Sequence, residues 1–96
     1  VPVAMTVACR AAGVVSSATA LNIGTGGLAL RPLVPVPSGE TLHLRFRLPT
    51  VAHDIEAEVR VCWTDLRFGI GVAFERISDE DQAAVASYVE RHLPAS

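Results

Sequence analysis

Apolar and polar residues alternate most regularly between Thr41 and Leu48. The apolar positions are every second residue: Leu42, Leu44, Phe46 and Leu48. Side chains of a strand point alternately to opposite faces, so this spacing predicts a strand with one buried face. The next segment repeats the pattern, and its predicted inward positions are Ile55, Ala57, Val59, Val61 and Trp63. We therefore expect Trp63 in the core, where truncation to alanine would cost about 3–5 kcal/mol and unfold the domain.

These two segments are predicted to form a hairpin around the loop of residues 49–54. In the predicted register Arg47 faces Glu56, and Arg45 faces Glu58. Directly opposed unlike charges contribute about 0.2–1 kcal/mol per pair, so they help to set the register. We interpret this ladder of charges as structural rather than as an active site.

Four further strands and one helix are predicted from the rest of the chain. The expected strands are residues 1–10, 14–22, 27–31 and 68–74. In the last one Phe68, Ile70, Val72 and Phe74 point inward, and glycine and alanine leave the outer face nearly bare. Ser78 is the predicted N-cap of a helix that begins with three acidic residues and ends at Pro94. Six strands and a terminal helix, with no helix between strands, predict an all-β fold: a six-stranded antiparallel barrel with a C-terminal α-helix.

The 96 residues suffice for one domain with one core, spanning residues 1–96, and half of them are hydrophobic. The chain begins at Val1 rather than at methionine, so we expect a piece of a longer protein or a shortened form of one. The net charge is −2 and every basic residue is arginine, which argues against a nucleic acid polymer as partner. No apolar run has the length of a transmembrane segment, and a cytoplasmic location is expected.

Catalytic and metal sites are not predicted. Cys9 and Cys62 form no CxxC pattern and lie in separate predicted strands. We interpret them as reduced structural thiols, with a disulfide left open. His43, His53 and His92 occupy a strand face, a loop tip and a helix end, where structural or solvated histidines are the rule. No nucleophile elbow or carboxylate pair occurs, so we expect no enzyme, no metal and no cofactor.

The sequence LNIGTGGLAL, residues 21–30, places three glycines behind an asparagine between two predicted strands. A β-turn would explain two glycines, since glycine tolerates positive φ. The spacing Asn-x-Gly-x-x-Gly also fits a place where a flat base or a phosphate approaches the main chain. Asn22, Gly24, Gly26 and Gly27 are therefore the candidate ligand-binding residues, with Asn22 offering a donor and an acceptor to a purine edge.

This segment resembles the [D/N]-x-S-x-x-G motif of the PilZ domains, which are receptors for the bacterial second messenger cyclic di-GMP. The sequences VPVAMTV, GLAL and FGIGVAF and the final helix are also similar to that family, so the resemblance covers nearly the whole chain. It implies a six-stranded antiparallel barrel with a C-terminal helix. It also implies that cyclic di-GMP binds at the asparagine–glycine segment.

Two departures from the family pattern bear on function. Gly24 stands where the family has serine, so one hydroxyl is missing. The family's R-x-x-x-R motif, whose arginines hold the phosphates and stack on guanine, would fall before Val1. Arg10 follows the first predicted strand and is not a substitute for it. The 96 residues alone are therefore expected to bind cyclic di-GMP weakly or not at all.

Two functions follow as hypotheses. The first is a sensor that binds cyclic di-GMP through Asn22, the glycines and arginines preceding Val1. The second is a degenerate PilZ domain that binds a partner protein instead of the nucleotide. The sensor hypothesis requires that the glycine segment lie beside an open surface and not be sealed under the terminal helix.

Overall fold

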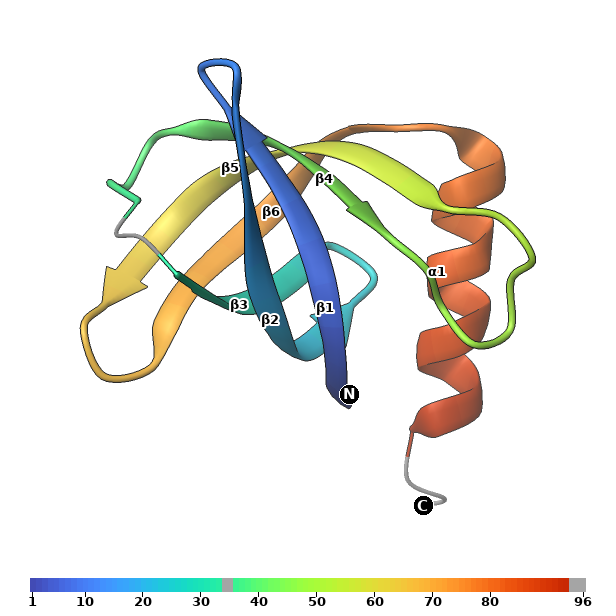
Figure 1. Cartoon of the computed structure of the whole chain (residues 1–96). Helices are drawn as coiled ribbons and strands as arrows, with labels where there is room; N and C mark the ends of the chain where they lie inside the picture. The colour runs from blue at the N-terminus through green and yellow to red at the C-terminus, as the bar shows by residue number, and fades with distance from the viewer. Residues whose placement is uncertain (34–35, 94–96) are drawn as a thin grey trace.

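The computed structural model describes residues 1–33 and 36–93. These residues form a closed barrel of six strands followed by one helix (Figure 1). The elements are β1 (Pro2–Ala11), β2 (Val14–Gly24), β3 (Gly27–Pro32), β4 (Thr41–Phe46), β5 (Ile55–Asp65), β6 (Gly69–Ile77) and α1 (Asp79–His92). Around the barrel the strand order is β1-β2-β3-β6-β5-β4, and all neighbouring strands are antiparallel. The antiparallel barrel with a C-terminal helix expected from the sequence is confirmed.

The core fills the interior of the barrel and extends under α1. Its largest fully buried side chains are Ile23, Leu30, Leu44, Leu48, Ile55, Val7, Val59, Val61 and Val85. Burying each of these aliphatic side chains contributes about 1.5–3 kcal/mol. The helix joins the same core through Val85, Tyr88 and Val89. The alternation seen in the sequence therefore separates inside from outside along most of each strand.

Helix α1 begins as the sequence predicts. The Ser78 hydroxyl accepts a hydrogen bond from the Asp81 amide over 3.1 Å, and acidic residues occupy the first turn. The helix ends at His92, and the predicted stop at Pro94 lies outside the described residues. Its start is also tied to the β4–β5 loop, because His53 Nε2 lies 2.9 Å from Asp81 Oδ1. Within the described residues, no helix combines the length and apolarity needed to cross a bilayer.

The predicted register of the β4–β5 hairpin is wrong by two residues. Arg45 pairs with Glu56, and His43 pairs with Glu58. Strand β4 ends at Phe46, and Leu48 enters the core from the loop, which makes the connection longer than predicted. Arg47 instead donates from Nε to Asp54 Oδ1 within the loop, over 3.0 Å.

The expected burial of Trp63 and Phe68 is also wrong. Strand β5 has a register shift between Val61 and Trp63, where Cys62 is an extra residue. This bulge breaks the alternation, and 48% of Trp63 is exposed. Phe68 lies in the β5–β6 turn, where its amide donates to Asp65 Oδ1, and its ring is also exposed. Strand β6 accordingly begins at Gly69 and not at Phe68.

Candidate functional site

Asn22 reaches the outer surface because strand β2 contains a bulge. The register with β3 shifts between Ala20 and Asn22, so Leu21 is an extra residue in β2. Ala18, Ala20 and Ile23 are buried, whereas Asn22 is exposed. Without the bulge, strict alternation would turn Asn22 inward together with Ala20. The bulge thus places the side-chain amide of Asn22 on the outer face of the barrel.

The three glycines of the β2–β3 hairpin differ in what they do. A Cβ on Gly27 would come into contact with the carbonyl of Val72 on β6, so the close approach of these two strands requires glycine there. A Cβ on Gly24 or Gly26 would meet nothing within 4 Å. Among the described glycines, those with positive φ are Gly13, Gly39 and Gly69. Gly24 and Gly26 are therefore not required by turn conformation or packing, and they leave open space on the outer face.

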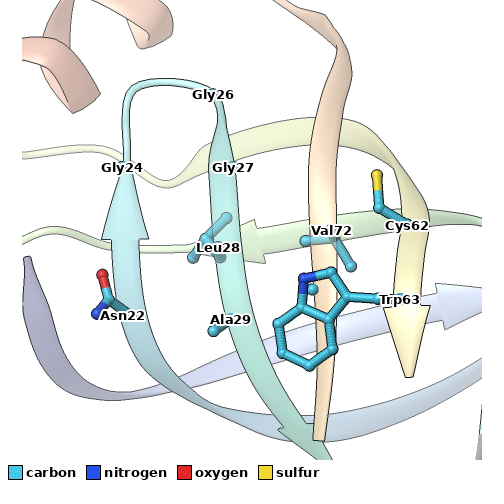
Figure 2. A pocket seen from close by; sticks show the side chains of 10 residues that line it. Asn22, Gly24, Gly26, Gly27, Leu28, Ala29, Cys62, Trp63 and Val72 are labelled. Atoms are coloured by element: carbon cyan, nitrogen blue, oxygen red, sulfur yellow. The ribbon is translucent and has the colours of Figure 1, made fainter. Parts of the chain in front are cut away.

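Trp63 forms a wall on the same outer face. Figure 2 shows its indole reaching from β5 across β6 toward β3. A Cβ on Gly71 of β6 would collide with the Nε1 and Cε2 atoms of the indole. The indole occupies the space that a side chain at Gly71 would fill. The outer face of β6 is therefore covered there rather than bare. Sequence reasoning missed Trp63 as a surface residue because the bulge at Cys62 carries no pattern in the sequence.

Asn22, the glycines and Trp63 border one open hollow of about 390 Å³ (Figure 2). We call it the glycine hollow, and its lining residues are Asn22, Gly24, Gly26, Gly27, Leu28, Ala29, Cys62, Trp63, Gly71 and Val72. All four candidate residues from the sequence therefore meet in one place. Among these described lining residues none is charged, so the hollow offers an aromatic face, an amide and bare main chain but no cation of its own.

The start of the chain lies at the edge of the glycine hollow. The Val1 nitrogen donates to Asn22 Oδ1 over 3.0 Å and to the carbonyl of Ile23 over 2.6 Å. The Ile23 amide in turn donates to the Val1 carbonyl over 2.8 Å. Any residues added before Val1 would therefore start directly beside Asn22.

The tip of the β2–β3 hairpin touches α1 without being covered by it. Gln82 Nε2 donates to the carbonyl of Thr25 over 2.9 Å. Thr25 and Gly26 are nevertheless exposed, and the glycine hollow lies beside them. The hairpin is thus held in place from the helix side and open on the other side.

The remaining chemically interesting side chains are engaged in structural contacts. His43 Nε2 lies 3.2 Å from Glu56 Oε1. His92 Nδ1 donates to the Tyr88 carbonyl over 2.8 Å, and the imidazole stacks on the Tyr88 ring. Cys9 and Cys62 are both free, and burial raises the pKa of the Cys9 thiol. Among the residues that the structure describes, no group of three or more metal-ligating side chains gathers.

Comparison with known protein families identifies the family of the chain. A family model described as the PilZ domain matches residues 1–91. The chain belongs to the PilZ family. The match includes the whole β2–β3 hairpin with Asn22 and the three glycines. PilZ domains are generally binding modules rather than enzymes.

A solved relative has the same architecture. The structure of the Bacillus subtilis inhibitor of motility (MotI/DgrA) superposes with a TM-score of 0.79 at 26% sequence identity. The alignment covers 95% of this chain and 47% of the relative, so the chain spans about half the length of that protein. No curated protein matches the chain.

Proposed function

We propose that the protein is a cytoplasmic sensor that binds cyclic di-GMP in the glycine hollow. The observation that carries this proposal is the pair of bulges, at Leu21 and at Cys62, which turn Asn22 and Trp63 outward onto one hollow. An amide can bind the edge of a guanine, and an indole can stack on its face. Gly24 and Gly26 leave the main chain free for close approach of the ligand.

The phosphates of the ligand need cations that the hollow lacks. Hydrogen bonds to charged groups contribute about 1.5–3 kcal/mol each, and arginine can grip a phosphate in a bidentate way. Because the Val1 nitrogen lies 3.0 Å from Asn22 Oδ1, arginines of a segment preceding Val1 would enter the hollow at its edge. The 96 residues alone are expected to bind the messenger weakly. Ordering of the preceding segment on binding would be the signal passed to a partner.

Isothermal titration of cyclic di-GMP tests the proposal with two matched versions of the chain. One version carries an added N-terminal segment with two arginines in the spacing R-x-x-x-R, and the other carries alanines at both positions. We expect saturable binding only with the arginines. Asn22→Ala should then weaken binding by about 1 kcal/mol, and Trp63→Ala by about 1–3 kcal/mol, without changing the melting temperature appreciably. Absence of heat from the arginine version at high messenger concentration would overturn the sensor proposal.

The second candidate function is a protein-interaction adaptor that has lost nucleotide binding. The specific observation in its favour is Gly24, which supplies no hydroxyl to the hollow where the family motif has serine. Gly24→Ser discriminates between the two, since a Cβ there has open space and the variant should fold normally. If the serine creates messenger binding that the original chain lacks even with the added arginines, the adaptor is the better assignment.

A further inference from the structure

Three of the exposed large apolar side chains, Leu33, Leu66 and Phe68, lie on the side of the barrel opposite α1 (Figure 1). The exposed large hydrophobic residues of the described chain are Val14, Val15, Leu33, Trp63, Leu66, Phe68 and Leu93. Leu33 follows strand β3, and Leu66 and Phe68 form the β5–β6 turn, which lies on the opposite side of the barrel from α1 (Figure 1). Leu66 is 103% exposed, so its side chain contributes nothing to the core.

Two arginines flank these apolar side chains. Arg31 is exposed at the end of β3, and Arg67 lies between Leu66 and Phe68, with its guanidinium carbon 5.5 Å from the Phe68 ring centre. In the described part of the chain, neither arginine takes part in an ion pair, whereas Arg47, Arg60 and Arg76 do. We call Arg31, Leu33, Leu66, Arg67 and Phe68 the distal patch.

The distal patch borders a second open hollow, of about 530 Å³, between the end of β3 and the β5–β6 turn. Its lining residues are Arg31, Pro32, Leu33, Val36, Pro37, Thr64, Asp65, Leu66, Arg67, Gly69 and Ile70. Asp65 is its one acidic group among the described residues, and Asp65 Oδ1 already accepts hydrogen bonds from the amides of Arg67 and Phe68. The patch is therefore apolar and positively charged on a chain whose net charge is −2.

We propose that the distal patch is the docking surface for a partner protein, and that it binds a segment in which apolar side chains are flanked by carboxylates. Contiguous exposed apolar side chains mark interaction surfaces, and aromatic and arginine side chains are enriched in protein interfaces. Charge complementarity selects the acidic partner, because two arginines without ion pairs face outward beside the apolar groups. This proposal deepens the adaptor candidate, and it stands whether or not the glycine hollow binds nucleotide.

Random peptides displayed on phage, selected against the full chain, test the proposal. We expect enriched peptides that combine Leu, Ile, Met or Phe with Asp or Glu. The tightest of them, synthesised with a fluorophore, should lose at least about tenfold in affinity to Leu66→Glu and to Arg67→Glu, and binding should weaken with salt. Amide shifts in the NMR spectrum should centre on residues 66–69. Val14→Glu and Arg10→Glu are the matched controls, since both residues are exposed on the β1–β2 hairpin and outside the distal patch, and they should bind as the original chain does.

Several outcomes would overturn the assignment. Enriched peptides that are neutral or basic would exclude an acidic partner. Peptides that bind Leu66→Glu as well as the original chain would exclude the distal patch as their binding site. Self-association in sedimentation that Leu66→Glu abolishes would make a second copy the occupant. Binding to phosphatidylserine vesicles lost in the same variant would make it a membrane surface. Cyclic di-GMP titration of Leu66→Glu in the version that carries the two added arginines separates the two proposals. Messenger binding should be unchanged by this variant, and a failure of messenger binding in the original sequence leaves the peptide result unaffected.

Discussion

The β4–β5 hairpin and the strands around the glycine hollow are built in opposite ways. β4 and β5 pair residue by residue over six positions with no register shift, and their outward polar side chains form pairs such as His43 with Glu56. The strands that border the hollow have bulges at Leu21 and Cys62. The first region is a regular ladder whose pattern serves stability. The second departs from the pattern at the two places that bring Asn22 and Trp63 to the surface.

Side-chain direction, and not residue type alone, marks the candidate site. Trp63 is a large apolar residue at a position that alternation assigns to the core, and Asn22 is a polar residue at a position that alternation also assigns to the core. One extra residue before each of them reverses the assignment. The same barrel thus holds a region in which truncation should damage folding and a region in which it should damage binding.

Truncation of Leu44 in the regular region and of Trp63 in the glycine hollow should differ most in the free energy of unfolding. Leu44 is fully buried, so Leu44→Ala should lower the free energy of unfolding by about 2–5 kcal/mol. Trp63→Ala should lower it much less, since half of the side chain is already in water. Urea titration followed by circular dichroism measures both. Equal destabilisation by the two variants would mean that the indole is part of the core after all.

The next effect separates the glycines inside the hollow. Gly27→Ala places a Cβ against the Val72 carbonyl, and one strand must move, at a cost of about 1–3 kcal/mol. Gly26→Ala, one residue away in the same hairpin, meets open space and should change stability by less than about 0.5 kcal/mol. Thermal denaturation of the two variants measures this difference in stability. If Gly26→Ala destabilises the protein as much as Gly27→Ala, glycine is required at position 26 for folding and the space beside it is not simply open.

The two cysteines extend the comparison to thiol chemistry. Cys9 lies in the regular part of the barrel, where it pairs with Leu44, and burial raises the pKa of its thiol, so its thiolate fraction is lower at any given pH. Cys62 is exposed at the bulge. Ellman's reagent should therefore react with one thiol quickly at neutral pH and with the second only on unfolding or at higher pH. Peptide mapping should identify the fast thiol as Cys62. Fast reaction of Cys9 would mean that the barrel opens locally.

The fold could be predicted from the sequence because apolar and polar residues alternate between the inner and outer faces of the barrel wherever strand pairing is regular. The six strands, the Ser78 cap and the four residues Asn22, Gly24, Gly26 and Gly27 all came from local patterns. Trp63 and Phe68 did not, since a bulge depends on how two strands pair and a turn on where pairing stops. Asn22 was found through the glycine motif, and its outward direction could not be read from periodicity. The distal patch was missed because Phe68 was assigned to the inner face of a strand, and because Leu66, between two predicted strands, belongs to no pattern in the sequence.

The exposed ion pair of Arg47 tests the register of the β4–β5 hairpin, and its contribution to stability should be small. The structure pairs Arg47 Nε with Asp54 Oδ1 at 3.0 Å, whereas the sequence placed Arg47 opposite Glu56. Both members of the observed pair are substantially exposed, so the coupling should be only about 0.2–1 kcal/mol and should fall with added salt. A double-mutant cycle with Arg47→Ala and Asp54→Ala measures it, and the cycle with Arg47→Ala and Glu56→Ala is the control. Because Glu56 lies beside His43 and pairs with Arg45, the control cycle should give a coupling near zero. Larger coupling of Arg47 to Glu56 than to Asp54 would restore the register predicted from the sequence and shift every outward residue of β4 by two positions along β5.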